Sequence, residues 1–188
     1  MRSKEKKIVL AIAGDIAAGK NAMADYIEKK YGGHSYRSSE VLRDILQRLD
    51  LPESRENMQK TSTMIREHFG KDIISKVAAF DLSKIKNKII AINGVRRLSD
   101  IEALKKDFTV KLIYVEADAK KRFERIGRRK ENSDERQKTF AQFKKDHLKE
   151  AEGQIGSLKK EADFVILNNS TKRDFYREID EVIKKIIK

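Results

Sequence analysis

The chain has 188 residues, of which 39% are hydrophobic and 39% charged, and its formal net charge at pH 7 is +13. This length and apolar content suit a single globular domain over residues 1–188. The chain has no cysteine, which excludes disulfides and thiolate metal sites, and no run approaches the roughly 18 apolar residues of a membrane span. We therefore expect a cytoplasmic protein without membrane contact.

Five apolar runs separated by helical patterns indicate a mostly parallel sheet. The expected strands are residues 7–13, 34–37, 88–93, 110–115 and 164–168. Strands that alternate with helices form βαβ units, so the order predicts an α/β fold with helices on both faces of the sheet.

A phosphate-binding loop is predicted directly after the first strand. Residues 14–21 read GDIAAGKN, which has the G-x-x-x-x-G-K spacing, and Met23, Ile27 and Tyr31 mark a helix behind it. In such a loop successive N–H groups turn toward phosphate oxygens, and the lysine reaches the β- and γ-phosphates. The alternative is an ordinary strand-to-helix turn that uses glycines for tightness. The predicted nucleotide-binding residues are Gly14, Asp15, Ile16, Ala17, Ala18, Gly19, Lys20, Asn21 and Ala22, and Lys20 is also expected to act in catalysis.

The later helices are marked by apolar spacing or by capping residues. Val41, Ile45 and Leu49 indicate a second helix, and Ser54 is expected to cap a third that ends at Gly70. Further helices are expected at residues 73–85, 99–106, 119–129, 139–160 and 171–188, the last opened by a capping box of Thr171 and Asp174.

Polar side chains follow the second and third strands, where open α/β sheets bind ligands. Ser39 and Arg43 come after the second strand, and Arg96 comes after the third. Because a guanidinium can hold a phosphate through two parallel hydrogen bonds, we predict that these residues bind a phosphorylated acceptor. Each arginine could instead pair with a nearby carboxylate on the surface.

Three further charged residues are catalytic candidates. Glu40 precedes Arg43 by three residues on one helix face, so it could orient the waters of Mg²⁺ or activate a hydroxyl, or it could simply suit the helix dipole. Arg125 and Arg129 share a face beside an expected lid at about residues 127–140, and could close over the transferring phosphoryl group. Their alternative is a solvated helix face. Asp15 could face the metal or the acceptor.

Taken together, residues 14–21, 38–43, 93–96, 122–126 and 162–168 resemble the P-loop nucleotide and nucleoside-phosphate kinases. The closest likeness is to dephospho-CoA kinase-like and uncharacterised archaeal P-loop kinase sequences. The resemblance implies a three-layer P-loop kinase fold, with a five-stranded parallel sheet, a mobile lid and a substrate-binding helical region at about residues 40–85. It implies ATP and Mg²⁺ as cofactors, with phosphoryl transfer to a nucleoside monophosphate, dephospho-CoA or a similar acceptor. It also places Asn168 near the adenine.

Two amides depart from the pattern of that family. Asn21 stands where a Ser or Thr hydroxyl normally touches Mg²⁺, and Asn93 stands where such kinases often carry an acid. An amide oxygen is a weaker ligand for a hard cation than a carboxylate, so Asn21 is an uncertain metal ligand. The amides leave open a second function, a nucleotide-binding regulator or degenerate kinase. The positive charge leaves open a third, a nucleic-acid-binding module, although the interleaving of basic with acidic residues favours solvated helix faces instead.

Overall fold

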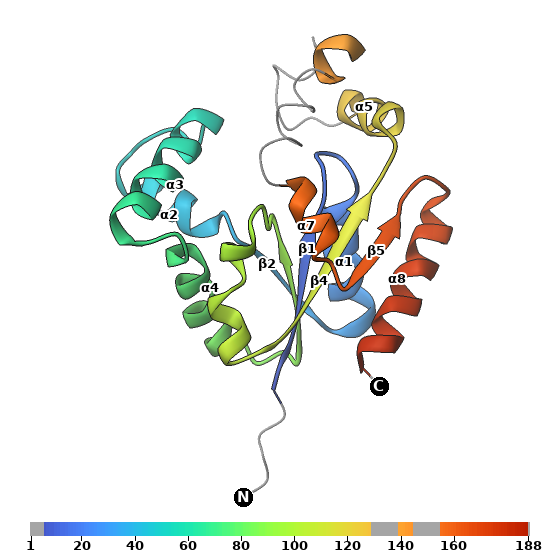
Figure 1. Ribbon diagram of the computed structural model, residues 1–188, viewed down its shortest axis with the longest axis horizontal. Coiled ribbons are helices and arrows are strands. Elements are labelled where there is room, and N and C mark those ends of the chain that lie inside the picture. The colour runs from blue at the N-terminus through green and yellow to red at the C-terminus, as the bar shows by residue number, and fades with distance from the viewer. Residues whose placement is uncertain (1–5, 129–138, 145–154, 188) are drawn as a thin grey trace, which may run out of the picture.

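Five parallel strands form one sheet in the computed structural model, which describes residues 6–128, 139–144 and 155–187 (Figure 1). The strands are β1 (Ile8–Ala13), β2 (His34–Arg37), β3 (Ile89–Asn93), β4 (Thr109–Glu116) and β5 (Phe164–Leu167), and their spatial order is β2-β3-β1-β4-β5. The central strand β1 pairs with β3 on one side and with β4 on the other. Because every pair is parallel, all five carboxyl ends lie at the same edge. The predicted five-stranded parallel sheet is confirmed.

Helices cover both faces of the sheet, and the pleat of β1 decides which side chains they meet. Val9 and Ala11 pack in one cluster with α4 (Ile73–Lys84) and α7 (Gly156–Lys160). Leu10 and Ile12 pack in the other with α1 (Lys20–Tyr31) and α8 (Lys172–Ile187). Since successive strand residues point to opposite faces, one apolar run fills both cores. This arrangement gives the three layers that were expected.

A separate group of helices stands beside the carboxyl edge of the sheet (Figure 1). It contains α2 (Glu40–Arg48) and α3 (Arg55–Phe69), which join the start of α4 around the buried side chains of Leu42, Ile65 and Ile74. The Ser54 hydroxyl accepts a hydrogen bond of 3.1 Å from the backbone N–H of Asn57, so the predicted cap of α3 is confirmed.

The predicted face of α2 is partly wrong. Leu42 and Leu46 are the buried residues of this helix, whereas Leu49 follows its last turn and is 59% exposed. Val41 and Ile45 pack only partly against the neighbouring helices. The contact with α3 therefore shifts the buried stripe by one position from the expected one.

The helix expected at residues 99–106 is also wrong. Two short 3₁₀ helices, η1 (Leu98–Asp100) and η2 (Ala103–Lys106), replace it. The Asp100 side chain accepts hydrogen bonds from the backbone N–H groups of Arg96 and Arg97, just before and at the N-cap of η1, and the backbone of Ile101, with φ −122° and ψ −2°, departs from helical geometry and ends η1.

The remaining elements follow the expected order. Helix α5 (Ala119–Arg128) comes after β4, residues 140–144 are helical, and the rest of the long helix expected at 139–160 includes residues 145–154, outside the described part. At the start of α8 the Asp174 N–H donates to the Thr171 hydroxyl over 3.2 Å, as the predicted capping box requires. Among the described residues, no helix is both long enough and apolar enough to cross a bilayer.

The packing of α8 on the sheet can be tested with two isoleucines of that helix. Ile183 is 1% exposed and lies in the sheet core, whereas Ile187 is 49% exposed. We expect Ile183→Ala to lower the free energy of unfolding by about 2–5 kcal/mol, because it leaves a cavity. Ile187→Ala is the matched control and should change it by less than about 0.5 kcal/mol. Urea denaturation measures both, and equal losses would contradict this packing.

Candidate functional site

Residues 14–19 connect β1 to α1 through a backbone that L-amino acids with large side chains rarely adopt. The φ angles of Gly14, Ala17 and Gly19 are +139°, +59° and +116°. A Cβ atom on Gly14 would lie 2.2 Å from the carbonyl oxygen of Val115, and one on Gly19 would lie 2.3 Å from Nδ2 of Asn168. Both glycines of the predicted loop are therefore required by space as well as by backbone angle.

The Lys20 side chain folds back over the start of the loop. Its Nζ atom donates hydrogen bonds to the carbonyl oxygens of Gly14 over 2.7 Å and of Asp15 over 2.8 Å. Lys20 is also the first residue of α1, whose first turn holds no acidic side chain. The positive end of the helix dipole and the ammonium group therefore act on the same small volume, which suits an anion.

Three side chains hold the loop from the side of α5 and β5 by binding its carbonyl groups. Arg125 Nη1 donates to Ala18 O over 3.3 Å and to Ala17 O over 3.4 Å. Asn168 Nδ2 donates to Ala18 O over 2.7 Å, and Arg122 Nη1 reaches Ile16 O at 3.4 Å. Arg125 Nη2 in turn donates to the backbone carbonyl of Asn168 over 2.8 Å, which joins these contacts into one network.

This network decides which way the loop amides point. In a planar trans peptide the N–H lies opposite the C=O. When the carbonyl groups of residues 16–18 turn toward α5 and β5, the following N–H groups turn away from them. The geometry of a phosphate-binding loop is thus set from outside the loop.

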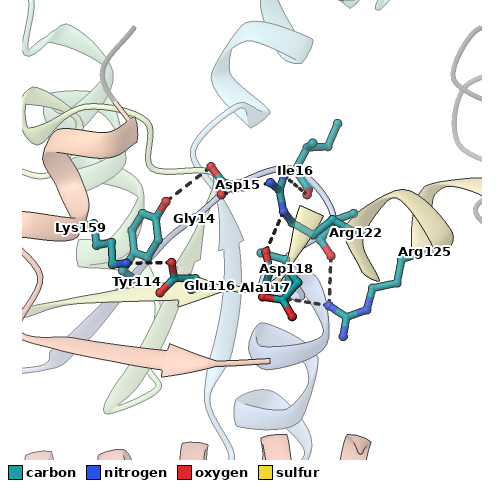
Figure 2. A network of polar contacts seen from close by, with 12 residues as sticks. Gly14, Asp15, Ile16, Tyr114, Glu116, Ala117, Asp118, Arg122, Arg125 and Lys159 are labelled. Atoms are coloured by element: carbon teal, nitrogen blue, oxygen red, sulfur yellow. Dashed lines mark hydrogen bonds and ion pairs between the residues drawn. The ribbon is translucent and has the colours of Figure 1, made fainter. Parts of the chain in front are cut away.

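Asp15 joins the same network from the first half of the loop (Figure 2). Its carboxylate lies 3.7 Å from Nη2 of Arg122, which is only 2% exposed, and accepts a 3.5 Å hydrogen bond from the Tyr114 hydroxyl. Burial, followed by the negative charge of Asp15, raises the pKa of Tyr114, so its hydroxyl keeps its proton at neutral pH. Arg122 also donates to Ala117 O over 2.9 Å. The observed partners of the Asp15 carboxylate therefore include Arg122 and Tyr114, which support the loop. Its expected contact with a metal or an acceptor stays a prediction.

Of the two arginines expected beside a lid, the structure describes Arg125, which contacts the phosphate loop together with its neighbour Arg122. Arg122 and Arg125 come from α5 and contact the loop backbone, and packing of Phe123, Ile126 and Phe143 with Ala17 holds α5 against the loop. Arg129 and most of the lid expected at about residues 127–140 lie outside the described residues. The catalytic role of Arg125 therefore stays a prediction, and its observed contacts are those of a loop support.

A cavity of about 360 Å³ opens beside the loop and is lined by all three residues predicted to bind substrate. Gly14, Ile16 and Lys20 line it from the loop, while Ser39 and Arg43 line it from the start of α2. Arg96, on the segment after β3, completes the set. Residues from three distant parts of the sequence thus share one space, at the edge where ligands were expected.

The far wall of this cavity comes from α3 and the turn before it, which lie within the helical region of about residues 40–85 that was expected to bind substrate, although none of its lining residues was predicted individually. Glu53, Met58, Gln59 and Ser62 line this wall. Met58 and Ser62 lie four residues apart on one helix face, and this spacing was the signal available in the sequence. The wall offers a carboxylate, an amide and a hydroxyl, which can orient the polar groups of a ligand.

Arg43 has one ionic partner in the cavity and one buried atom without a partner. Its Nη1 atom pairs with the Glu53 carboxylate, and both side chains remain partly exposed. Its Nε atom is buried and has no hydrogen-bond partner among the described residues. A buried donor that lacks a partner is costly, so the pairing with Glu53 leaves the guanidinium group of Arg43 incompletely satisfied.

The described contacts of Glu40 and Asn168 are not those that their predicted roles require. Glu40 begins α2, but its side chain is exposed and is not one of those that line the cavity. The Asn168 side chain is buried and bonded to the loop backbone, so it supports the loop. A catalytic role for Glu40 and an adenine contact for Asn168 stay predictions.

The two amides that depart from the kinase pattern contact each other. Asn93 Nδ2 donates to Oδ1 of Asn21, and the backbone carbonyl of Asn93 accepts from the Ser38 N–H over 3.0 Å. Across the described ranges, no cluster of three or more histidine or acidic side chains forms a ready metal site. The residues at this position therefore supply neutral oxygen atoms, which suit Mg²⁺ only when waters and phosphates provide its other ligands.

Solved kinase structures share this fold. Shikimate kinase from Bacteroides thetaiotaomicron matches with a TM-score of 0.62 at 10% identity, over 94% of this chain and 98% of that one. Shikimate kinase from Acinetobacter baumannii, in complex with shikimate, matches with a TM-score of 0.58 at 15% identity, over 96% and 94%. Such identities establish the likeness of the fold alone, which is that of the P-loop kinases.

The sequence matches one protein-family model and a group of related proteins. The model of the AAA domain matches residues 14–144. A UPF0200 protein of Sulfurisphaera tokodaii is 31% identical over 179 residues, covering 95% of this chain and 97% of the relative. A UPF0200 protein of Thermococcus onnurineus is 26% identical over 185 residues, covering 96% and 98%. The chain therefore belongs to the UPF0200 family, and its residues 14–144 belong to the AAA domain family.

Proposed function

We propose that this protein is a small-molecule kinase, which transfers the γ-phosphoryl group of ATP to a phosphorylated, nucleotide-like acceptor. One observation carries the proposal: Lys20 of the phosphate loop lines the same cavity as Arg43 and Arg96. A triphosphate on the loop and a phosphate on the two arginines would lie in one continuous space. A nucleoside monophosphate and dephospho-CoA are the acceptor types that we favour.

Catalysis in such a site would rest on position and charge. The bond between the γ-phosphorus and its bridging oxygen breaks while an acceptor oxygen bonds to the phosphorus, so the protein needs no covalent step. Lys20 and the loop amides would neutralise the donor phosphates, and the two arginines would hold the acceptor in line. Mg²⁺, held near Asn21 mainly by waters and phosphates, would neutralise charge on the donor.

Nucleotide binding depends first on the shape of the loop. We expect Gly19→Ala to weaken ATP binding by about tenfold or more, because the new Cβ would displace the Asn168 side chain from Ala18. Gly127→Ala is the matched control, since nothing lies within 4 Å of a Cβ at that helical position. Calorimetry and thermal stabilisation by ATP measure the affinity. Equal ATP affinity in the two variants would contradict the role of the loop.

Turnover provides the test of the kinase itself. Purified protein with ATP and Mg²⁺ is given a panel of nucleoside monophosphates and dephospho-CoA, and acceptor-dependent ADP is measured. We expect Lys20→Ala to reduce that ADP formation by about 1,000-fold, because the ammonium group is lost where charge develops. Lys29→Ala, an exposed change on the same helix, should leave it unchanged. The proposal fails if no acceptor in the panel promotes ADP formation and Lys20→Ala has no effect.

The contact between Asn21 and Asn93 favours a second candidate, a nucleotide-binding regulator with little or no turnover. If the amide pair limits the metal site, a carboxylate at position 93 should restore it. Our kinase proposal instead expects Asn93→Asp to change turnover by less than about tenfold, because the phosphates and waters already hold the metal.

Steady-state kinetics over a range of Mg²⁺ concentrations distinguish these two candidates. Asn87→Asp makes the same chemical change just before β3, at the opposite end of that strand, and serves as the control. A gain of about 100-fold or more that is specific to Asn93→Asp would favour the regulator over the kinase.

A further inference from the structure

A buried ion pair joins the two walls of the acceptor cavity. Arg66 on α3 pairs with Asp100 on η1 at 2.6 Å, and the two side chains are 8% and 5% exposed. Neither residue lines the cavity of about 360 Å³. Each of them, however, contacts a residue that does.

On the α3 side the link runs through Ser62. Arg66 Nε donates to the Ser62 hydroxyl over 3.3 Å, and Ser62 lines the cavity. Arg66 Nη1 also donates to the backbone carbonyl of Lys71, beyond the end of α3. The guanidinium group of Arg66 thus contacts the Ser62 hydroxyl, the Lys71 carbonyl and the Asp100 carboxylate, and these contacts restrain the last two turns of α3.

On the opposite side the link runs through the backbone of the segment after β3. The second carboxylate oxygen of Asp100 accepts the N–H of Arg96 over 2.9 Å and the N–H of Arg97 over 3.0 Å. Arg96 is exposed and lines the cavity, whereas the Asp100 carboxylate that accepts its backbone N–H is buried. Asp100 therefore anchors the backbone of the segment that carries Arg96.

Stability alone is a poor reason for this arrangement. Removing two charges from water costs much of what their attraction returns, and apolar replacements of a buried pair are often neutral or stabilising. The planar guanidinium group does offer several donors in a fixed geometry, which a hydrophobic contact lacks. The pair is therefore better suited to fix a position than to increase stability.

We propose that Arg66 and Asp100 are positioning residues for the acceptor site, which hold the Arg96 segment at a fixed place relative to α3. The inference rests on the proposed function of that cavity. An acceptor that binds between Arg96 and the α3 wall would then find the two walls already fixed at the correct distance and orientation. Loss of the pair would weaken acceptor binding and leave the phosphate loop intact, since these two residues make no contact with it.

The test uses the double variant Arg66→Met/Asp100→Asn, which removes both charges and leaves no unpaired ion in the core. The control is Lys111→Met/Asp163→Asn. Asp163 has the same arrangement, because one oxygen pairs with Lys111 at 2.9 Å while the other accepts the Leu112 N–H over 2.8 Å. That pair joins the beginnings of β4 and β5, away from the cavity. If the double variant does not fold, Arg66→Lys replaces it, because lysine keeps the positive charge but lacks the several planar N–H donors of the guanidinium group.

Three measurements are made on each folded variant. They are the ATP affinity, the affinity for inorganic phosphate with a non-hydrolysable ATP analogue on the loop, and the hydrogen exchange rates of the Arg96 and Arg97 amides. We expect the Arg66/Asp100 variant to bind ATP within about twofold of wild type and phosphate about tenfold more weakly. The two amides should exchange about tenfold faster. The Lys111/Asp163 control should match wild type in all three.

Wild-type phosphate affinity and exchange rates in the folded Arg66/Asp100 variant would overturn the inference. Failure of the proposed function would look different, because wild-type phosphate binding would then be insensitive to Arg43→Gln. In that case the exchange rates still decide the point: faster exchange confined to Arg96 and Arg97 supports the mechanical link, and unchanged exchange overturns it.

Discussion

The carbonyl groups of the phosphate loop are the groups on which the rest of the site depends. Arg125 and Asn168 bind the carbonyl of Ala18, and Arg122 reaches that of Ile16. With its carbonyl groups engaged on the side of α5 and β5, the loop must present N–H groups on its other side. An anion site made of backbone amides is therefore prepared before any nucleotide arrives, and the ordering cost on binding is smaller.

The two halves of the proposed kinase site, for the phosphoryl donor and for the acceptor, consist of different kinds of groups. The donor half consists of main-chain groups whose direction is fixed by buried side chains and by the core of the sheet. The acceptor half consists of the partly exposed side chain of Arg43 and the exposed one of Arg96, standing on helices and a segment outside the sheet. Such an arrangement suits a donor bound by the main chain and an acceptor selected by side-chain contacts, and it fits the positioning role that we propose for the Arg66–Asp100 pair beside the acceptor half.

Local sequence patterns predicted the parts of this molecule that local physics determines. The apolar strands, the Ser54 cap and the G-x-x-x-x-G-K loop each depend on neighbours within a few residues, and each was placed correctly. The buried face of α2 was misjudged because α3, a partner distant in sequence, selects Leu42 and Leu46. The helix at 99–106 failed for the same kind of reason, since the Asp100 carboxylate binds backbone groups instead of solvent.

In the candidate site, too, features set by local sequence were predicted and features set by distant partners were not. Arg43 and Arg96 were predicted from their places after parallel strands, and they do share a cavity with Lys20. The hydrogen bonds by which Arg122, Arg125 and Asn168 support the phosphate loop were not predicted. The sequence pattern of an arginine-rich helix face is the same whether that face contacts solvent or a neighbouring loop. Only the fold shows that Arg122 is buried, and the sequence of α3 gave no sign that Ser62 and Arg66 connect to Asp100.

The amide pair of Asn21 and Asn93 changes the charge balance of the whole site. A carboxylate at position 93 would add one negative charge beside the loop, which attracts Mg²⁺ and repels phosphate. An amide removes that charge and leaves Lys20, Arg43 and Arg96 beside Glu53, the single carboxylate among the described residues that line the cavity. Phosphate groups are then attracted more strongly by the protein, while the metal depends more on the phosphates themselves. In the kinase that we propose, neutralisation of the substrates would therefore shift from the metal toward the fixed cations of the chain, which stand on the loop and the two cavity walls.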